Sequence, residues 1–79
     1  MPALVYILIL TKQAKIKQVT QRLMKFDEVK EVHELYGQYD VIAKAEGKQM
    51  KDIEDFIQKK IRTDKDIEGT ETLVASDVF

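Results

Sequence analysis

The sequence predicts an α+β fold of the ferredoxin-like type, with its elements in the order β-α-β-β-α-β. Three observations predict it. The chain opens with a continuous apolar run at residues 3–11, and two stretches, 12–26 and 48–62, repeat apolar residues at three- and four-residue steps. Two strand-like runs lie between those stretches and are joined by a short turn at Gly37. We therefore expect one domain, residues 1–79, with both helices on the same face of the sheet.

The first third of the chain predicts a strand followed by a helix. Residues 3–11 are apolar or β-branched almost throughout, which is typical of a strand that is buried on both faces. Residues 12–26 then place Ile16, Val19, Leu23 and Met24 on one helical stripe. The basic residues of this stretch fall mostly off the stripe, and we expect them to face solvent: Lys12, Lys15, Lys17, Arg22 and Lys25.

The remaining elements are a hairpin, a second helix and a last strand. Residues 29–36 and 39–46 predict two antiparallel strands, because only a short connection separates them. Residues 64–69 predict a polar connection in which Asp64 and Asp66 are solvated charges, and residues 70–79 predict the last strand. The second helix, residues 48–62, has one apolar face made of Met50, Ile53, Phe56, Ile57 and Ile61.

The composition excludes several classes of protein. A length of 79 residues suits a single domain, and the absence of cysteine excludes disulfides and cysteine-based zinc sites. The formal net charge of −1 argues against a general nucleic-acid-binding domain. The longest apolar run, residues 3–10, is too short to cross a bilayer and lacks the features of a signal peptide, so we expect a cytoplasmic protein without membrane attachment.

Side chains that carry out catalysis are scarce. His33 is the sole histidine, Ser76 is the sole serine, and no motif surrounds either. The three glycines are isolated from one another, so no glycine-rich loop is present to cradle phosphate. We therefore expect no enzyme activity, no bound metal and no cofactor.

The turn Gly37-Gln38-Tyr39-Asp40 is the strongest candidate for a binding site. Glycine permits a positive φ, tyrosine offers a flat face with a polar tip, and aspartate offers an anionic acceptor for an ammonium group. These groups suit a small zwitterion such as a free amino acid. The alternative is a purely structural hairpin loop, in which Tyr39 packs and Asp40 caps the turn.

The first strand also predicts self-association. Its alternate residues point to opposite faces of the sheet, and both sets are apolar: Leu4, Tyr6, Leu8 and Leu10 on one side, Val5, Ile7 and Ile9 on the other. The helices cover one face only, so the other face stays open and apolar. We expect a homo-oligomer in which two such faces pack together.

The element order, this turn and the late segment Thr70-Glu71-Thr72-Leu73-Val74 resemble the ligand-binding domain of the Lrp/AsnC transcriptional regulators, also called the RAM domain. The resemblance covers essentially the whole chain. It implies a dimeric α/β barrel, assembly of dimers into rings (often octamers), and an effector amino acid bound between dimers. In this family the turn approaches the ligand, the aspartate pairs with its ammonium group, and the last strand completes the pocket. The ligand-binding residues so implied are Gly37, Gln38, Tyr39, Asp40, Thr70, Thr72 and Val74.

One departure from the family pattern concerns DNA. Full-length members carry a helix-turn-helix before this domain, whereas the first predicted strand here begins at residue 3. The chain therefore resembles a stand-alone RAM protein, and we expect no direct DNA binding. Its expected roles are to sense amino acids, to assemble, and to modulate full-length Lrp/AsnC regulators by joining them.

Two other readings stay open at this point. A small monooxygenase of the dimeric α/β barrel superfamily would need polar groups in the cavity between sheet and helices, for which Tyr6, His33 and Tyr36 are the candidates. A regulatory module of the ACT type has the same element order but pairs its sheets side by side, which the apolar first strand disfavours.

Overall fold

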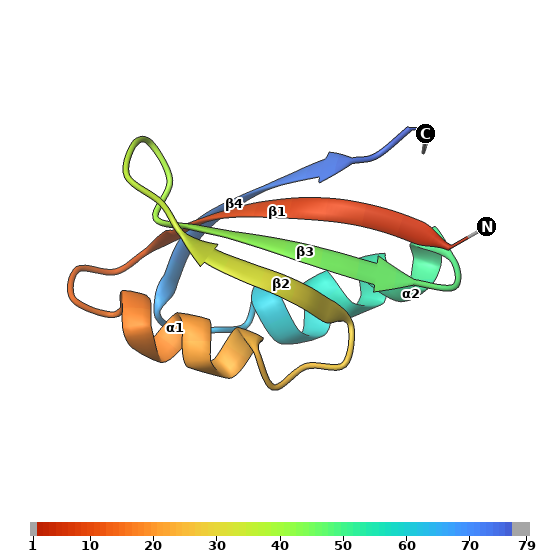
Figure 1. The fold of residues 1–79 in the computed structure, drawn as a ribbon. Coiled ribbons are helices and arrows are strands. Elements are labelled where there is room, and N and C mark those ends of the chain that lie inside the picture. The colour runs from red at the N-terminus through yellow and green to blue at the C-terminus, as the bar shows by residue number, and fades with distance from the viewer. Residues whose placement is uncertain (1, 77–79) are drawn as a thin grey trace.

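The computed structural model describes residues 2–76, which form a four-stranded antiparallel sheet with the helices on one side (Figure 1). The strand order is β2-β3-β1-β4, so the first strand lies inside the sheet and the last strand forms an edge. This arrangement confirms the predicted ferredoxin-like β-α-β-β-α-β order. The elements are β1 (Ala3–Thr11), α1 (Ile16–Leu23), β2 (Val29–Glu34), β3 (Val41–Gly47), α2 (Met50–Phe56), a π-helical turn (Ile57–Ile61) and β4 (Ile67–Val74).

Both helices are shorter than the apolar spacing predicts. Helix α1 begins at Ile16 because the chain first makes a turn in which Ala14 adopts a left-handed conformation with φ of 66°. Helix α2 gives way to the π-helical turn after Phe56, and there the N–H of Arg62 donates to the carbonyl of Ile57, five residues earlier, at 2.9 Å.

The last strand begins earlier and ends earlier than predicted. Residues 67–69 belong to β4 rather than to a polar connection, because Gly69 pairs with Leu10 and Ile67 pairs with Thr11 across a bulge. The strand ends at Val74. The predicted strand residues Val78 and Phe79 lie outside the described part of the chain.

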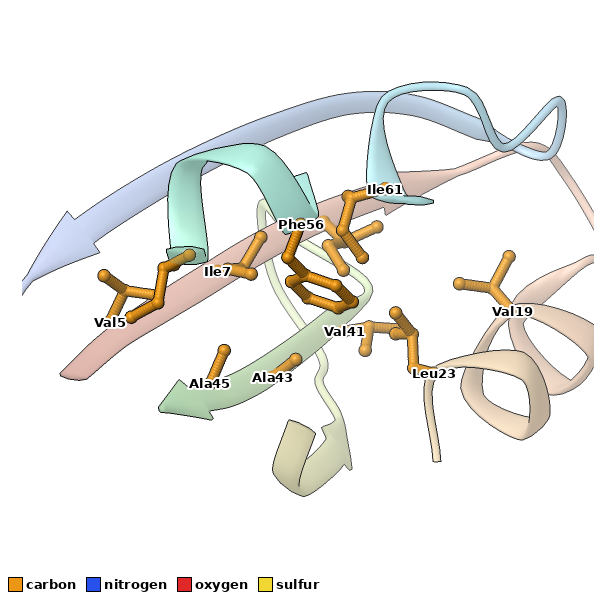
Figure 2. Packing of buried hydrophobic residues seen from close by; sticks show 11 residues of the cluster. Val5, Ile7, Val19, Leu23, Val41, Ala43, Ala45, Phe56 and Ile61 are labelled. Carbon is orange, nitrogen blue, oxygen red and sulfur yellow. The ribbon is translucent and has the colours of Figure 1, made fainter. Parts of the chain in front are cut away.

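The core lies between the sheet and the helices (Figure 2). Val5, Ile7 and Ile9 of β1 are completely buried there, because β1 is flanked by a strand on each side and its helix-facing side chains are covered. Phe26 and Phe56 meet edge to face with ring centroids 5.3 Å apart, which links the turn after α1 to the end of α2. The other buried apolar residues are Val19, Leu23, Val41, Ala43, Ala45, Ile53, Phe56 and Ile61.

The opposite face of the sheet is uncovered in the single chain and is apolar along β1, with Lys44, Glu46 and Glu71 on the flanking strands. The register sets Leu8 of β1 beside Ile42 of β3, and Tyr6 beside Leu73 of β4. Leu10 and Leu73 are among the exposed large apolar residues, while Leu4, Tyr6, Leu8 and Ile42 are partly exposed. The prediction of an open apolar face is confirmed. We use the name open face for the surface formed by Leu4, Tyr6, Leu8, Leu10, Ile42 and Leu73.

One prediction about charge was wrong. Arg22, Asp64 and Asp66 are not solvated charges but form a clamp that joins the end of α1 to the start of β4. Nε and Nη2 of Arg22 donate to Oδ2 and Oδ1 of Asp64 at 2.9 and 2.8 Å, and Nη2 also donates to Oδ2 of Asp66 at 2.9 Å. Burial works to raise the pKa of Asp64, but hydrogen bonds from Arg22 and from the backbone N–H of Asp66 outweigh it, so the pKa is lowered.

None of the helices between residues 2 and 76 is long and apolar enough to cross a membrane.

Candidate ligand-binding site

The loop between β2 and β3 carries the first group of predicted site residues. It rises on the side of the sheet away from the helices (Figure 1) and is closed by the N–H of Leu35, which donates to the carbonyl of Asp40 at 2.8 Å. Gly37 has φ of 145°, a conformation that other residues rarely adopt. An added Cβ at this position would meet nothing within 4 Å, so the backbone conformation and not crowding requires glycine. Tyr36, beside it, is fully exposed.

Asp40 ties this loop to the end of β1. Its N–H donates to the carbonyl of Ile9 at 2.9 Å, and its Oδ2 accepts hydrogen bonds from the backbone N–H and the hydroxyl of Thr11 at 2.9 and 3.3 Å. Asp40 therefore has a structural role, although its carboxylate holds the end of β1 and not the backbone of the turn. Within residues 2–76 its other carboxylate oxygen, Oδ1, accepts no hydrogen bond. Pairing of that oxygen with an ammonium group stays a prediction.

Tyr39 connects the loop to the far edge of the sheet. Its hydroxyl donates to Oε1 of Glu71 on β4 at 3.3 Å, so the loop reaches across the end of β1. Glu71 pairs with Leu8 and therefore lies on the open face. Desolvation, together with the charge and hydrogen bond of Glu71, raises the pKa of Tyr39. Gln38 is exposed.

The second group of predicted residues lies on the other side of the sheet. Thr70, Thr72 and Val74 pair with Ile9, Ile7 and Val5, whose side chains point toward the helices, and so all three share that side. They form one wall of a groove of about 390 Å³ between β4 and α2. We call it the α2–β4 groove. Its lining consists of Val5, Met50, Ile53, Glu54, Ile57, Gln58, Arg62, Thr70, Thr72 and Val74.

The seven predicted residues thus fall in two places, the loop and the groove, on opposite sides of one sheet. A single chain does not bring them together. Glu54, Gln58 and Arg62, which face the threonines across the groove, were missed by the sequence reasoning. Their signal was present in the regular four-residue spacing along the second helix, which puts them on one row beside its apolar face.

The structure also shows where the three residues lie that a monooxygenase activity would require. Tyr6 and His33 lie on the uncovered side of the sheet, and Tyr36 projects from the loop. His33 is largely exposed, with Nε2 3.3 Å from Oε1 of Glu31. None of the three lies between sheet and helices, where that activity would need them. Across residues 2–76, no three histidine or acidic side chains gather in a way that could hold a metal ion.

Comparison with known protein families finds a match that spans almost the whole chain. The family described as "Lrp/AsnC ligand binding domain" matches residues 4–79. Among curated proteins, the chain is 32% identical over 71 residues to the HTH-type transcriptional regulator FL11 of Pyrococcus furiosus, and 34% identical to FL11 of Pyrococcus abyssi. These matches cover 90% of this chain but 46% of each relative, so the chain spans about half the length of the curated relatives it matches.

Solved structures share the fold closely. The crystal structure of FFRP-DM1 superimposes with a TM-score of 0.91 at 38% identity, covering 92% of this chain and 97% of that one. A hypothetical protein of Pyrococcus horikoshii, PHS023, gives a TM-score of 0.90 at 39% identity over 95% of this chain and 89% of its own. AsnC of E. coli gives 0.89 at 26% identity, covering 96% of this chain and 52% of AsnC.

Proposed function

Because the chain belongs to the Lrp/AsnC ligand-binding-domain family, we propose that it is a RAM domain, residues 1–79, that binds a free amino acid and thereby regulates transcription factors of this family. The observation that carries the proposal is the division of the family's binding residues between two sides of one sheet. Such a site becomes complete only when the loop of one copy meets the groove of another. The effector then lies between copies and couples amino-acid concentration to assembly.

The loop is the ammonium-binding half of the proposed site. Asp40 is already held in place by Thr11 through Oδ2, and this arrangement orients Oδ1 before any ligand arrives. Gly37 keeps the turn free of a side chain at its tip, so a neighbouring chain can approach its backbone closely. Gln38 and Tyr39 flank the ligand on either side of the turn.

The open face supports the proposed homodimer. It is a sheet surface with aliphatic side chains on three adjacent strands, which is typical of an interaction surface. Packing of two such faces around a two-fold axis forms a dimeric α/β barrel, and it leaves the loops and grooves free to join dimers into a ring, for which an octamer is our expectation.

The relatives suggest what the assembly regulates. FL11 of Pyrococcus furiosus is an HTH-type transcriptional regulator about twice as long as this chain. We propose that this chain joins full-length regulators of that kind through the same open face, and that it alters their response without touching DNA itself.

Calorimetric titration with the common amino acids tests the binding proposal. Asp40→Asn is the informative variant, because its amide oxygen still accepts the hydrogen bonds from Thr11 while the charge is lost. We expect one amino acid to bind the wild type in the micromolar range and the variant at least tenfold more weakly. Tyr36→Ala, a substitution at a fully exposed loop residue outside the predicted ligand-binding set, controls for general disturbance of the turn. Absence of binding by every amino acid would refute an effector role.

A further inference from the structure

Glu71 is an acidic side chain among apolar neighbours of the open face. It pairs with Leu8 of β1, and Leu73 follows it two residues later on the same face of β4. Leu73 is 47% exposed, so this part of the face is uncovered in the single chain. A second sheet that covers Leu8 and Leu73 must therefore also come close to Glu71.

The acidic side chains of this face differ in their partners. Glu31 on β2 accepts a hydrogen bond from Nζ of Lys44 at 3.4 Å, and Nε2 of His33 lies 3.3 Å from its other oxygen. Within residues 2–76, Glu71 forms no salt bridge, and the hydroxyl of Tyr39 is the one group that donates to its carboxylate. Removal of water from a charge is costly unless hydrogen bonds stabilise that charge. The Tyr39 hydroxyl is therefore the group of this chain that offsets the cost of covering Glu71.

The hydrogen bond between Tyr39 and Glu71 is weak while the face is open to water. Its length of 3.3 Å exceeds the usual O–H···O distance by about 0.5 Å, and Glu71 is exposed, so water competes for both groups. Exclusion of water strengthens a hydrogen bond to a charged acceptor. The strength of this contact thus depends on whether another molecule covers the open face.

The same hydrogen bond restrains the loop between β2 and β3. The loop rises on the side of the sheet away from the helices, which is the side of the open face (Figure 1). Asp40 fixes the base of the loop to β1 through Ile9 and Thr11. Tyr39 adds the tie to β4, and this second tie is the one that covering of the open face would strengthen.

We infer that Glu71 is a positioning residue: in the open-face dimer its covered carboxylate holds Tyr39, and through it the Gly37–Asp40 loop, so that dimerisation and loop position are coupled. This inference rests on the dimer of the proposed function and adds a route from the dimer interface to the loop. Coupling between two equilibria is reciprocal. A molecule that binds the loop and moves Tyr39 away from Glu71 therefore weakens the dimer by the factor by which dimerisation weakens its own binding.

The test uses the full chain and needs no effector. Sedimentation over a dilution series gives the dissociation constant of the dimer, and native mass spectrometry of mixed unlabelled and isotope-labelled protein gives the rate at which dimers exchange copies. Tyr39→Phe should raise the dissociation constant about tenfold and speed the exchange, because both copies lose the hydrogen bond. Tyr36→Phe removes the same hydroxyl from a fully exposed neighbour that makes no side-chain hydrogen bond within residues 2–76, and it should change neither quantity.

A second pair of variants shows whether the effect depends on the charge of Glu71. In Glu71→Gln the side chain is uncharged and costs less to cover without a donor. Tyr39→Phe in that background should therefore change the dissociation constant by less than about twofold. An equally large effect of Tyr39→Phe in both backgrounds would overturn the role of Glu71.

Hydrogen exchange distinguishes a coupled loop from a merely structural hydrogen bond. The amides of Leu35 and Asp40 donate to the carbonyls of Asp40 and Ile9, so their exchange reports opening of the loop. In the wild type both amides should exchange severalfold more slowly in the dimer than in the monomer at high dilution. In Tyr39→Phe that difference should disappear, and persistence of the full difference would overturn the inference.

The outcomes separate this inference from the dimer on which it rests. A chain that stays monomeric, or a dimer whose mass Leu8→Lys leaves unchanged, would overturn the open-face dimer together with the inference. A dimer that Leu8→Lys disrupts but Tyr39→Phe leaves unchanged would overturn the inference alone, and it would indicate that the second copy or water stabilises Glu71. Weaker dimerisation in Tyr39→Phe that depends on the charge of Glu71 supports both.

Discussion

Replacing Arg22 by glutamine removes the cation that two nearly buried carboxylates share. The side chains of Asp64 and Asp66 are 11% and 10% exposed, and Arg22 donates to them at 2.8–2.9 Å. Loss of one partner of a fully buried ion pair costs about 3–5 kcal/mol. Because the Arg22 side chain is 39% exposed, water can partly replace it, and we expect a loss of about 2–3 kcal/mol. In urea this corresponds to a fall of about 2 M in the unfolding midpoint.

The pH dependence provides a second, independent readout. Asp64 has a lowered pKa in the folded chain, so its ion pair contributes stability that is present above its unfolded pKa of about 3.9 and is lost as the pH falls through the folded value. The difference in the free energy of unfolding between wild type and Arg22→Gln should therefore have its full size near pH 7 and become smaller below about pH 4.

Two controls make this prediction specific to the clamp. Lys25→Gln removes an exposed basic residue just beyond the end of α1 and should change the free energy of unfolding by less than about 0.5 kcal/mol. The triple variant Arg22→Gln, Asp64→Asn, Asp66→Asn should regain part of the loss, because no buried charge is left unpaired. The reasoning is refuted if Arg22→Gln costs less than about 0.5 kcal/mol, or if its cost is the same at pH 3 and pH 7.

Three further predictions concern the turn, the loop and the open face. Ala14→Gly should raise the free energy of unfolding by about 0.5–1 kcal/mol, because glycine adopts the left-handed φ of 66° without strain; a lower thermal midpoint would contradict this. Asp40→Ala should lower the free energy of unfolding by about 1–2 kcal/mol through loss of the acceptor for Thr11, while Asp40→Asn should stay within about 0.5 kcal/mol of wild type; equal losses in denaturant titrations would argue against the hydrogen bond. Leu8→Lys on the open face should reduce the particle mass in light scattering with an unchanged circular dichroism spectrum, and an unchanged mass would exclude this face as the dimer interface.

The order of elements was predictable because it depends on local patterns. The continuous apolar run of β1 and the apolar helical stripes were visible in the sequence, and the structure buries most of their residues, although Met24, predicted on the first stripe, is 70% exposed beyond the end of α1. The glycine turn was also visible, and Gly37 has the positive φ that its position requires. Each of these features is set by neighbours within a few residues along the chain.

Features that depend on distant pairs were not predictable in the same way. The partner of Arg22 lies 42 residues away, so no local pattern distinguishes this arginine from the solvated lysines around it. The side of the sheet that Thr70 and Thr72 face depends on the register between β4 and β1, which includes a bulge between Leu10 and Thr11. A shift of one residue would have moved both threonines to the open face.

The place of β1 in the sheet also bears on how the chain is made. β1 pairs with β3 on one side and with β4 on the other, and its partner Val74 lies about 70 residues beyond Val5 in the sequence. During translation β1 therefore leaves the ribosome well before β4, with the backbone groups of one edge unpaired. Antiparallel pairing over such a separation is slow compared with helix formation. Until β4 arrives, this apolar strand is the part of the nascent chain most exposed to aggregation, and it is where we expect a chaperone to bind.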